Sequence, residues 1–312
     1  MSTILLWLLT FSCLLFLPSL TIGIIRKTKA RLQNRVGAPL WQHLFDTIKL
    51  LRKSETVSEN SSWILRVNTV INISIMITLA FLTPWLSFKP ATSADDLFLL
   101  IYLFAAIRFF AILSSLDPGS AFGAFGASRE ATLSVLVEPA IILALSAVAL
   151  SAHTSNLSLV FALTANTPIS QAPLWLLAGA GLFLSSLVEL SRMPVDDPTT
   201  HLELTMVHEA MMLENSGPNL ALLEFSSALR LVVLYGLSGQ CFLHALHCIW
   251  PFASAAGILL SISIIFALAV VTSLIETVSV RLKWTRAPEF VAYGLTMSLL
   301  ALLVALVTGV SS

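Results

Sequence analysis

The sequence predicts an all-α integral membrane protein with about eight transmembrane helices plus a short amphipathic interfacial helix. Hydrophobic residues make up 57% of the 312 residues, charged residues make up only 11%, and the mean hydropathy is +0.90. Several apolar stretches approach about twenty residues, the length that an α-helix needs to cross a bilayer. Because no internal repeat divides the chain, we expect residues 1–312 to form a single membrane domain. The formal net charge of +0 argues against a nucleic-acid partner, since no basic excess is available to neutralise phosphates.

The first predicted span is the apolar run 4–25. No basic residue precedes it and it is longer than the core of a signal peptide, so we interpret it as a retained membrane helix. The other predicted spans are 67–87, 97–116, 132–152, 173–191, 219–247, 254–277 and 289–309. Three cysteines lie in or beside these apolar helices without the paired spacing of a metal site or a disulfide framework, so we expect them to be packing residues.

The orientation follows from the basic residues. Most of the 17 Lys and Arg residues lie in four segments, 26–66, 117–131, 192–218 and 278–288. Positively charged loops resist translocation, so these segments should face the inside and the N-terminus should lie outside.

The segment 26–66 contains a second pattern, since Leu40, Leu44, Ile48 and Leu51 recur at helical spacing. This spacing predicts a short amphipathic helix lying along the membrane interface, with Asp46 and Lys49 turned toward water. The alternative is a basic segment held by anionic lipid headgroups, to which each Lys or Arg contributes about 1 kcal/mol.

Charged residues also occur within or at the edges of the predicted spans. They are Arg108, Glu138, Glu189, Glu224, Arg230 and Glu276. Each charge at the bilayer centre costs about 2.5 to 3.5 kcal/mol on insertion scales. Two explanations remain open: structural ion pairs, or a hydrated path for protons lined by these carboxylates. By contrast, Arg129 and Glu130 suit a solvated turn before the 132–152 span.

The densest polar stretch runs from residue 189 to residue 217. It contains Glu189, Asp196, Asp197, Glu203, Glu209 and Glu214 together with His201 and His208. Pro194 and Pro198 interrupt any helix there, which predicts a turn on the inside face. The histidines lack the spacing of a catalytic zinc helix, so we predict no metal site in this chain. The alternative to a functional role for this stretch is a solvated acidic loop.

Several motifs in one order carry a resemblance to a known family. They are the basic run ARLQNRVGAP, the GASRE run with Glu138 nine residues after Arg129, and ELSRMPVDDP followed by Glu203 and Glu224. This arrangement resembles the membrane protein that docks the peripheral arm of respiratory complex I, which in mitochondria is called subunit 1. The run VDDPTTHLELTMVHEAM is similar to the relatives of that protein in energy-converting nickel-iron hydrogenases and formate hydrogenlyase, in which no quinone need be bound.

The resemblance implies a non-catalytic subunit that couples a redox reaction to proton or sodium translocation in the inner membrane of a prokaryote. The implied partners are the hydrogenase large and small subunits, a ferredoxin-like iron-sulfur subunit and antiporter-like membrane subunits. Iron-sulfur clusters and the nickel-iron centre are expected in those partners, and no cofactor in this chain. The four inside segments would form the docking face, with Arg26, Arg31, Arg35, Arg129 and Arg192. The ion path would begin at Glu138, Asp196, Glu203, Glu209, Glu214 and Glu224, with Glu189, Arg230 and Glu276 as further candidates.

Two alternatives remain open. One is a quinone-binding subunit of an NADH-quinone oxidoreductase-like complex, in which the inside segments would form the walls of a quinone tunnel. The other is a free-standing ion transporter, which would be expected to show internal repeats.

Overall fold

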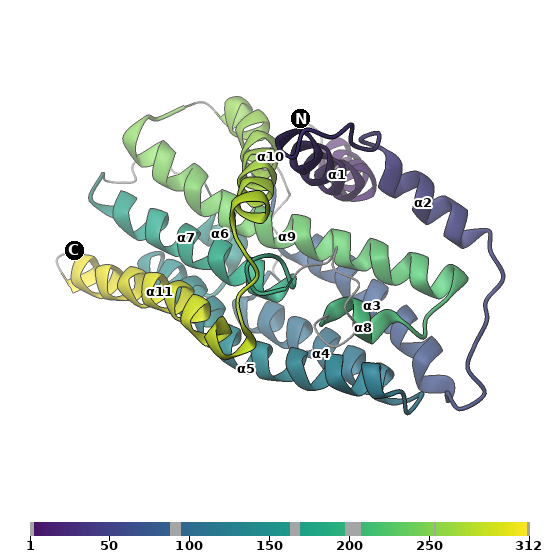
Figure 1. Ribbon diagram of the computed structural model, residues 1–312. Helices are drawn as coiled ribbons and strands as arrows, with labels where there is room; N and C mark the ends of the chain where they lie inside the picture. The colour runs from purple at the N-terminus through teal and green to yellow at the C-terminus, as the bar shows by residue number, and fades with distance from the viewer. Residues whose placement is uncertain (1–2, 88–94, 163–168, 197–206, 253, 311–312) are drawn as a thin grey trace.

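The computed structural model describes residues 3–87, 95–162, 169–196, 207–252 and 254–310 (Figure 1). Helices account for the regular structure in these ranges, apart from an isolated β-bridge between Asp96 and Asn156. In chain order the helices are α1 (Thr3–Leu32), α2 (Gln42–Leu51), α3 (Trp63–Leu82), α4 (Leu97–Leu116), α5 (Ala121–Ser151), α6 (Leu157–Val160), the 3-10 helix η1 (Ile169–Gln171), α7 (Ala172–Glu189), α8 (His208–Met212), α9 (Gly217–Ile249), α10 (Ser254–Val278), the 3-10 helix η2 (Trp284–Arg286) and α11 (Ala287–Val310).

Eight of the helices in the described part of the chain are long and apolar enough to cross a membrane, which confirms the predicted fold class. These candidate spans lie in α1, α3, α4, α5, α7, α9, α10 and α11. The largest departure from the prediction is at α5. It begins at Ala121, because the Ser120 side chain accepts a hydrogen bond from the backbone of Gly123 and caps the helix. Most of segment 117–131 is therefore helical.

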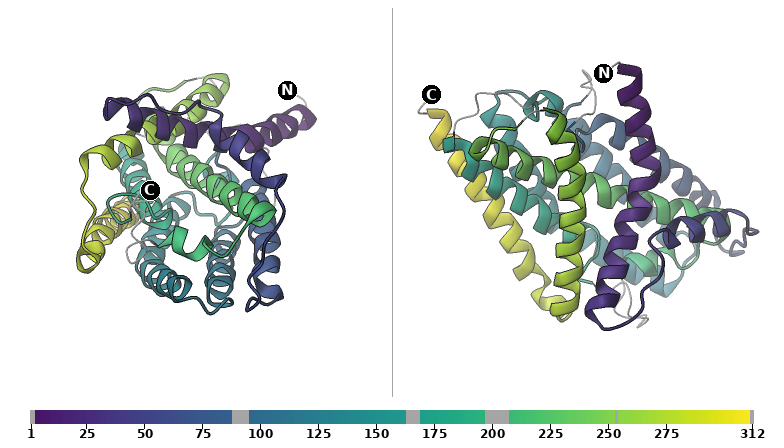
Figure 2. Two further views of the ribbon diagram at one scale, coloured as in Figure 1. Left: turned by 45° about the vertical axis from the view of Figure 1, so that its right-hand side comes forward. Right: turned by 90° about the horizontal axis from the view of Figure 1, so that it is seen from above.

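Helix α9 lies at the centre of the bundle, and most of its residues are buried (Figure 2). Helices α1, α2, α3, α7 and α10 pack around it, while α11 packs on α5 and α7. Close approach of backbones supports this arrangement, since a Cβ on Gly236 of α9 would lie 2.7 Å from the carbonyl oxygen of Trp85. Small residues at helix interfaces allow such contacts where lipid provides no hydrophobic drive for association.

Helix α2 forms where the spacing of apolar residues predicted it, and Lys49 is exposed as expected, but two other polar residues face the protein. His43 and Thr47 are buried between α2 and its neighbours α1 and α9, whereas Phe45, Ile48 and Leu51 are exposed. The exposed apolar residues suit contact with lipid. The polar side of the helix is thereby available to line an internal site.

We predict that Gly236→Val destabilises the protein by about 1 to 3 kcal/mol, because the added side chain would force α9 away from Trp85. The free energy of unfolding in detergent micelles measures this effect. Gly239→Ala is the matched control on the same helix, since its Cβ would meet only the side chain of Ile264, at 3.2 Å, and no backbone atom. Equal losses in the two variants would contradict the close-packing explanation.

Candidate functional site

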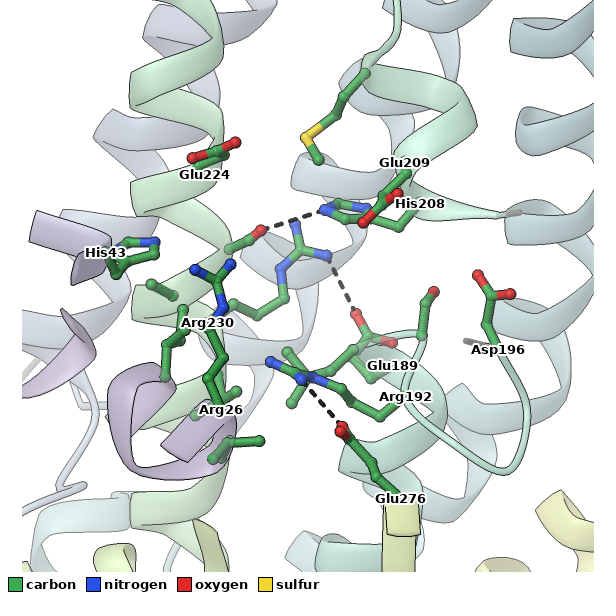
Figure 3. Close-up of a pocket in the computed structure, with 18 of the residues that line it drawn as sticks. Arg26, His43, Glu189, Arg192, Asp196, His208, Glu209, Glu224, Arg230 and Glu276 are labelled. Atoms are coloured by element: carbon green, nitrogen blue, oxygen red, sulfur yellow. Dashed lines mark hydrogen bonds and ion pairs between the residues drawn. The ribbon is translucent and has the colours of Figure 1, made fainter. Parts of the chain in front are cut away.

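A cavity of about 520 Å³ lies among α1, α2, α8, α9, α10 and the segment that follows α7 (Figure 3). We call it the central cavity. Its charged and histidine lining residues are Arg26, Lys29, His43, Glu189, Arg192, Asp196, His208, Glu209, Glu224, Arg230 and Glu276. The prediction had distributed these residues among several loops and spans, and the fold brings them to one place.

Beside this cavity, Arg108 joins three helices through an ion-pair network. Its Nε donates to Glu189 Oε1 at 2.9 Å and its Nη2 lies 2.9 Å from Glu189 Oε2, so α4 and α7 are held by a two-pronged contact. Its Nη1 donates to Glu138 of α5. The side chains of Arg108 and Glu189 are almost fully buried, whereas the Glu138 side chain is 39% exposed. The network therefore extends from the cavity wall to a carboxylate at the protein surface.

A second ion-pair group ties α1 and α10 to the segment after α7. Glu276 of α10 accepts from Lys29 of α1 at 3.2 Å and from Arg192 at 3.0 Å. Arg192 reaches this position because α7 ends at a sharp turn, with Ser191 in the left-handed region (φ 47°). The backbone N–H of Arg192 donates to the Leu187 carbonyl at 2.8 Å, which satisfies an end carbonyl of the helix.

The same segment is also attached to the connection between α10 and η2. Asp196 Oδ1 lies 3.0 Å from Arg281 Nη2, and Asp196 Oδ2 accepts from the backbone N–H of Val207 at 2.9 Å. The backbone N–H of Leu282 donates to the carbonyl of Pro194 at 2.9 Å. Residues 190–196 are thus held at both ends by contacts with α10 and the residues that follow it.

Two histidines outside the membrane spans face the central cavity. Burial lowers the pKa of His43 to about 4, with a further contribution from the positive charge of Arg26. Burial also lowers the pKa of His208 to about 4, assisted by Arg230 and Arg192. Their nitrogens contact hydroxyls, His43 Nδ1 at 3.3 Å from Ser19 Oγ and His208 Nε2 at 3.2 Å from Ser227 Oγ. Both rings are therefore neutral, polar lining groups at physiological pH.

The residues predicted for docking occupy two different environments. Arg26 and Arg192 belong to the wall of the central cavity. Arg31 and Arg35 are exposed near the end of α1, and Arg129 is partly exposed, with its guanidinium 5.6 Å from the ring centroid of Trp284. Of the five, Arg26, Arg31 and Arg35 are thus exposed and Arg129 is partly exposed, while Arg26 also lines the central cavity.

The residues predicted for the ion path are mostly brought together. Glu138, Glu189 and Arg230 gather around Arg108, while Asp196, Glu209, Glu224 and Glu276 line the central cavity. Glu214 is partly buried and does not line this cavity. Glu203 lies outside the described residues, as do Asp197 and His201.

One interpretation from the sequence was wrong, and several pairings were missed. Glu130 is not in a solvated turn but is 6% exposed, because α5 begins at Ala121 and already includes this residue. The sequence analysis also missed Lys29 and Arg281 as partners of Glu276 and Asp196. The only feature of the sequence that indicated these two residues was the basic character of the segments that contain them. Among the described residues, no three His, Cys, Asp or Glu side chains gather as metal ligands.

The chain matches the protein family described as NADH dehydrogenase over residues 4–307. It belongs to that family. Among characterised relatives, it is 37% identical to hydrogenase-4 component C of Escherichia coli K12 over 234 residues, which are 74% of this chain and 72% of that protein. It is 35% identical to formate hydrogenlyase subunit 4 of the same organism over 213 residues, 68% of each chain.

A solved structure supports the same family fold. The chain is similar to a chain of the membrane-bound sulfane sulfur reductase, an archaeal respiratory membrane complex, with a TM-score of 0.79 and 18% sequence identity. The likeness covers 98% of this chain and 100% of the other. This NADH dehydrogenase family member is therefore a multi-pass membrane protein whose helices follow the arrangement found in that complex.

The low pKa of His208 predicts how stability depends on pH. The folded state keeps this ring neutral down to about pH 4, whereas an unfolded histidine takes up a proton below its ordinary pKa of 6.5. The neutral ring therefore stabilises the folded state fully above pH 6.5. As the pH falls toward 4 the free energy of unfolding decreases by roughly 2 to 3 kcal/mol, because the unfolded histidine takes up a proton and the folded one does not. We expect His208→Gln to remove this part of the pH dependence.

Unfolding in detergent micelles at several pH values measures the difference. His153→Asn is the control, because His153 is exposed and its left-handed backbone (φ 52°) accommodates asparagine. If the free energy of unfolding of His208→Gln depended on pH as steeply as that of the wild type, the assignment to this ring would be contradicted.

Proposed function

We propose that this chain is the membrane anchor and coupling subunit of an energy-converting hydrogenase or formate hydrogenlyase-type complex related to respiratory complex I. In this role it docks an iron-sulfur peripheral arm at its inside face and links the redox reaction to translocation of protons or sodium ions. The chain would lie in the inner membrane of a prokaryote with its N-terminus outside. Similarity to hydrogenase-4 component C and formate hydrogenlyase subunit 4 supports this choice of complex.

The observation that carries the proposal is the Arg108 network. It connects Glu189, in the wall of the central cavity, with Glu138, whose side chain is 39% exposed within the α5 span. A carboxylate exposed at membrane depth requires water or a polar partner, because lipid provides neither. We infer that Glu138 faces an antiporter-like membrane subunit and that the ion path continues from Glu138 into that subunit.

Docking of the peripheral arm would use the accessible basic residues Arg31, Arg35 and Arg129. Arg31 lies at the end of α1 and Arg35 in the connection to α2, and both of these helices contribute to the wall of the central cavity. The segment 190–196 is paired with Glu276 and Arg281. A change of charge in a partner bound at the inside face would therefore act on the cavity through these helices and ion pairs.

The quinone alternative is less well supported by the cavity lining. Ligand sites for apolar rings and tails are lined mainly by hydrophobic and aromatic side chains. The described lining of the central cavity includes no Phe, Tyr or Trp, and it places eleven charged or histidine side chains beside its Ile, Leu and Met residues. The lining suits water, ions and protons better than a quinone.

We predict that Glu189→Gln uncouples the complex. The glutamine cannot exchange a proton, and it leaves Arg108 with Glu138 as its remaining carboxylate contact. Redox activity of the purified complex should remain near the wild-type level, while ion uptake by inside-out vesicles falls about tenfold or more. Glu59→Gln, at an exposed position of an inside segment, is the control. Full ion pumping in Glu189→Gln would contradict the proposed path.

A second prediction concerns docking. Replacing both Arg31 and Arg35 by Glu should weaken association with the iron-sulfur partner about tenfold or more, because like charges would then oppose each other across the interface. Affinity purification at increasing salt, followed by mass spectrometry of the retained subunits, measures the loss. The double Lys variant keeps both charges and should retain the partner. Equal retention by the Glu and Lys variants would place the docking face elsewhere.

A further inference from the structure

Arg230 in the central cavity makes no short contact with a carboxylate of the described residues. This residue of α9 is 7% exposed, and its Nε has no hydrogen-bond partner in the described part of the chain. Its contact with Glu189 is long, at 3.8 Å from Nη1 to Oε1, and Glu189 already receives Arg108 at 2.9 Å through both of its oxygens. Glu130 of α5 is the other carboxylate near enough to act on its charge. A guanidinium keeps its charge at any physiological pH, so the positive charge of Arg230 is buried and poorly matched.

Arg26 of α1 is more exposed than Arg230, and it too has no short contact with a carboxylate of a described residue. Its side chain extends into the cavity, and in the view of Figure 3 its guanidinium lies between His43 and Arg230. The structure gives it no hydrogen bond and no ion pair with any described residue. The other two cations of the lining, Lys29 and Arg192, share Glu276. Arg26 and Arg230 are therefore the two lining cations that remain without a short contact to a carboxylate among the described residues.

The carboxylates of the lining are mostly engaged. Glu276 and Asp196 hold cations at 3.0 to 3.2 Å, and Glu209 has an interaction of its own. Glu224 is the exception, since it makes no hydrogen bond or ion pair with a described residue. The charged groups that face it are Arg26 of α1 and Asp46 of α2. When Glu224 is ionised it balances Arg26 across the cavity, and when it is protonated both guanidiniums are left unbalanced.

We propose that the central cavity binds a small oxyanion of the carboxylate or bicarbonate class between Arg230 and Arg26, together with a proton at Glu224. A guanidinium matches a planar oxyanion because its parallel N–H groups meet two oxygens at once. The volume of about 520 Å³ holds such an ion with several waters. The bound anion supplies the negative charge that no described residue places close to Arg230, and the proton removes the repulsion from Glu224.

The lowered pKa values of the two histidines reflect burial and a positive electrostatic potential on both sides of this site. Apart from burial, Arg26 lowers the pKa of His43, while Arg230 and Arg192 lower that of His208. Because both pKa values lie at about 4, neither ring titrates in the neutral range. Any dependence of anion binding on pH in that range therefore belongs to carboxylates. Of those that line the cavity, Glu224 is the one without a described partner.

This inference adds a ligand to the same cavity and rests on the proposed function only in that its proton would belong to the ion path. The test is equilibrium dialysis of radiolabelled acetate against the full chain, purified with its bound partners in mild detergent. A bulky sulfonate buffer keeps the ionic strength constant. We expect one saturable site per chain, with affinity rising as the pH falls from the mildly alkaline to the mildly acidic range.

Four variants make the test specific. Arg230→Gln and Arg26→Gln should each weaken acetate binding about tenfold, since each removes a charge-assisted hydrogen-bond donor. Glu224→Gln should tighten binding about fivefold at neutral pH and flatten its pH dependence. Arg66→Gln is the control, because Arg66 forms an exposed ion pair with Glu55 away from the cavity. If Arg230→Gln fails to fold, Arg26→Gln and Glu224→Gln still provide opposite expected shifts.

Absence of saturable binding, or wild-type binding by Arg26→Gln, would overturn the proposal. Displacement of acetate by short-chain phosphatidylglycerol at equal or lower concentration would also overturn it, by showing that a lipid headgroup is the occupant. The assay requires neither turnover nor transport, so a negative result leaves the proposed coupling function intact. Conversely, failure of the Glu189→Gln prediction would leave an acetate site demonstrated by dialysis unaffected.

Discussion

The structure depends on the cost of holding an arginine charge inside a membrane. A guanidinium cannot shed its proton there, so Arg108, at 5% exposure within α4, requires anions close by. Glu189 and Glu138 meet this requirement, and they come from α7 and α5. The pairing fixes how three helices lie relative to one another. Removing one member would leave an uncompensated buried charge, which is far more costly than never having the pair.

Other buried charged groups are likewise paired with opposite charges that come from different elements. Glu276 of α10 lies between a lysine of α1 and an arginine that follows α7, and Asp196 lies beside Arg281. The interior contains a large apolar core, and around the central cavity polar residues are buried while apolar residues face outward. Helix α2 buries His43 and Thr47 while exposing Ile48 to the surroundings. A polar interior and an apolar exterior are what a bilayer selects around a hydrated cavity.

The sequence was sufficient to predict the elements but not their contacts. Apolar run length and the position of basic residues predicted eight spans, because insertion into a bilayer depends on local composition. Glu130 was misplaced since the cap at Ser120 starts α5 before the apolar run, and hydropathy does not report a cap. The pairing of Lys29 with Glu276 joins residues 247 positions apart, and no local pattern encodes it. The candidate carboxylates, Arg108 and Arg230 were identifiable because charge in an apolar span is costly, whereas Lys29 and Arg281 lie in basic segments and were not singled out.

The segment 190–196 is the element best placed to connect the two faces of the proposed mechanism. Arg192 and Asp196 bind partners at opposite ends of this short stretch, and both partners belong to α10 or the residues just after it. Protonation of either carboxylate in these pairs removes one attachment and leaves the other in place. Under the proposed function the segment would then have two discrete arrangements, which is the physical requirement for transmitting a local charge change. Because Glu276 also holds Lys29, the same event alters the contact between α1 and α10. In the proposed function, a redox change on the inside face would reach the wall of the central cavity through these ion pairs.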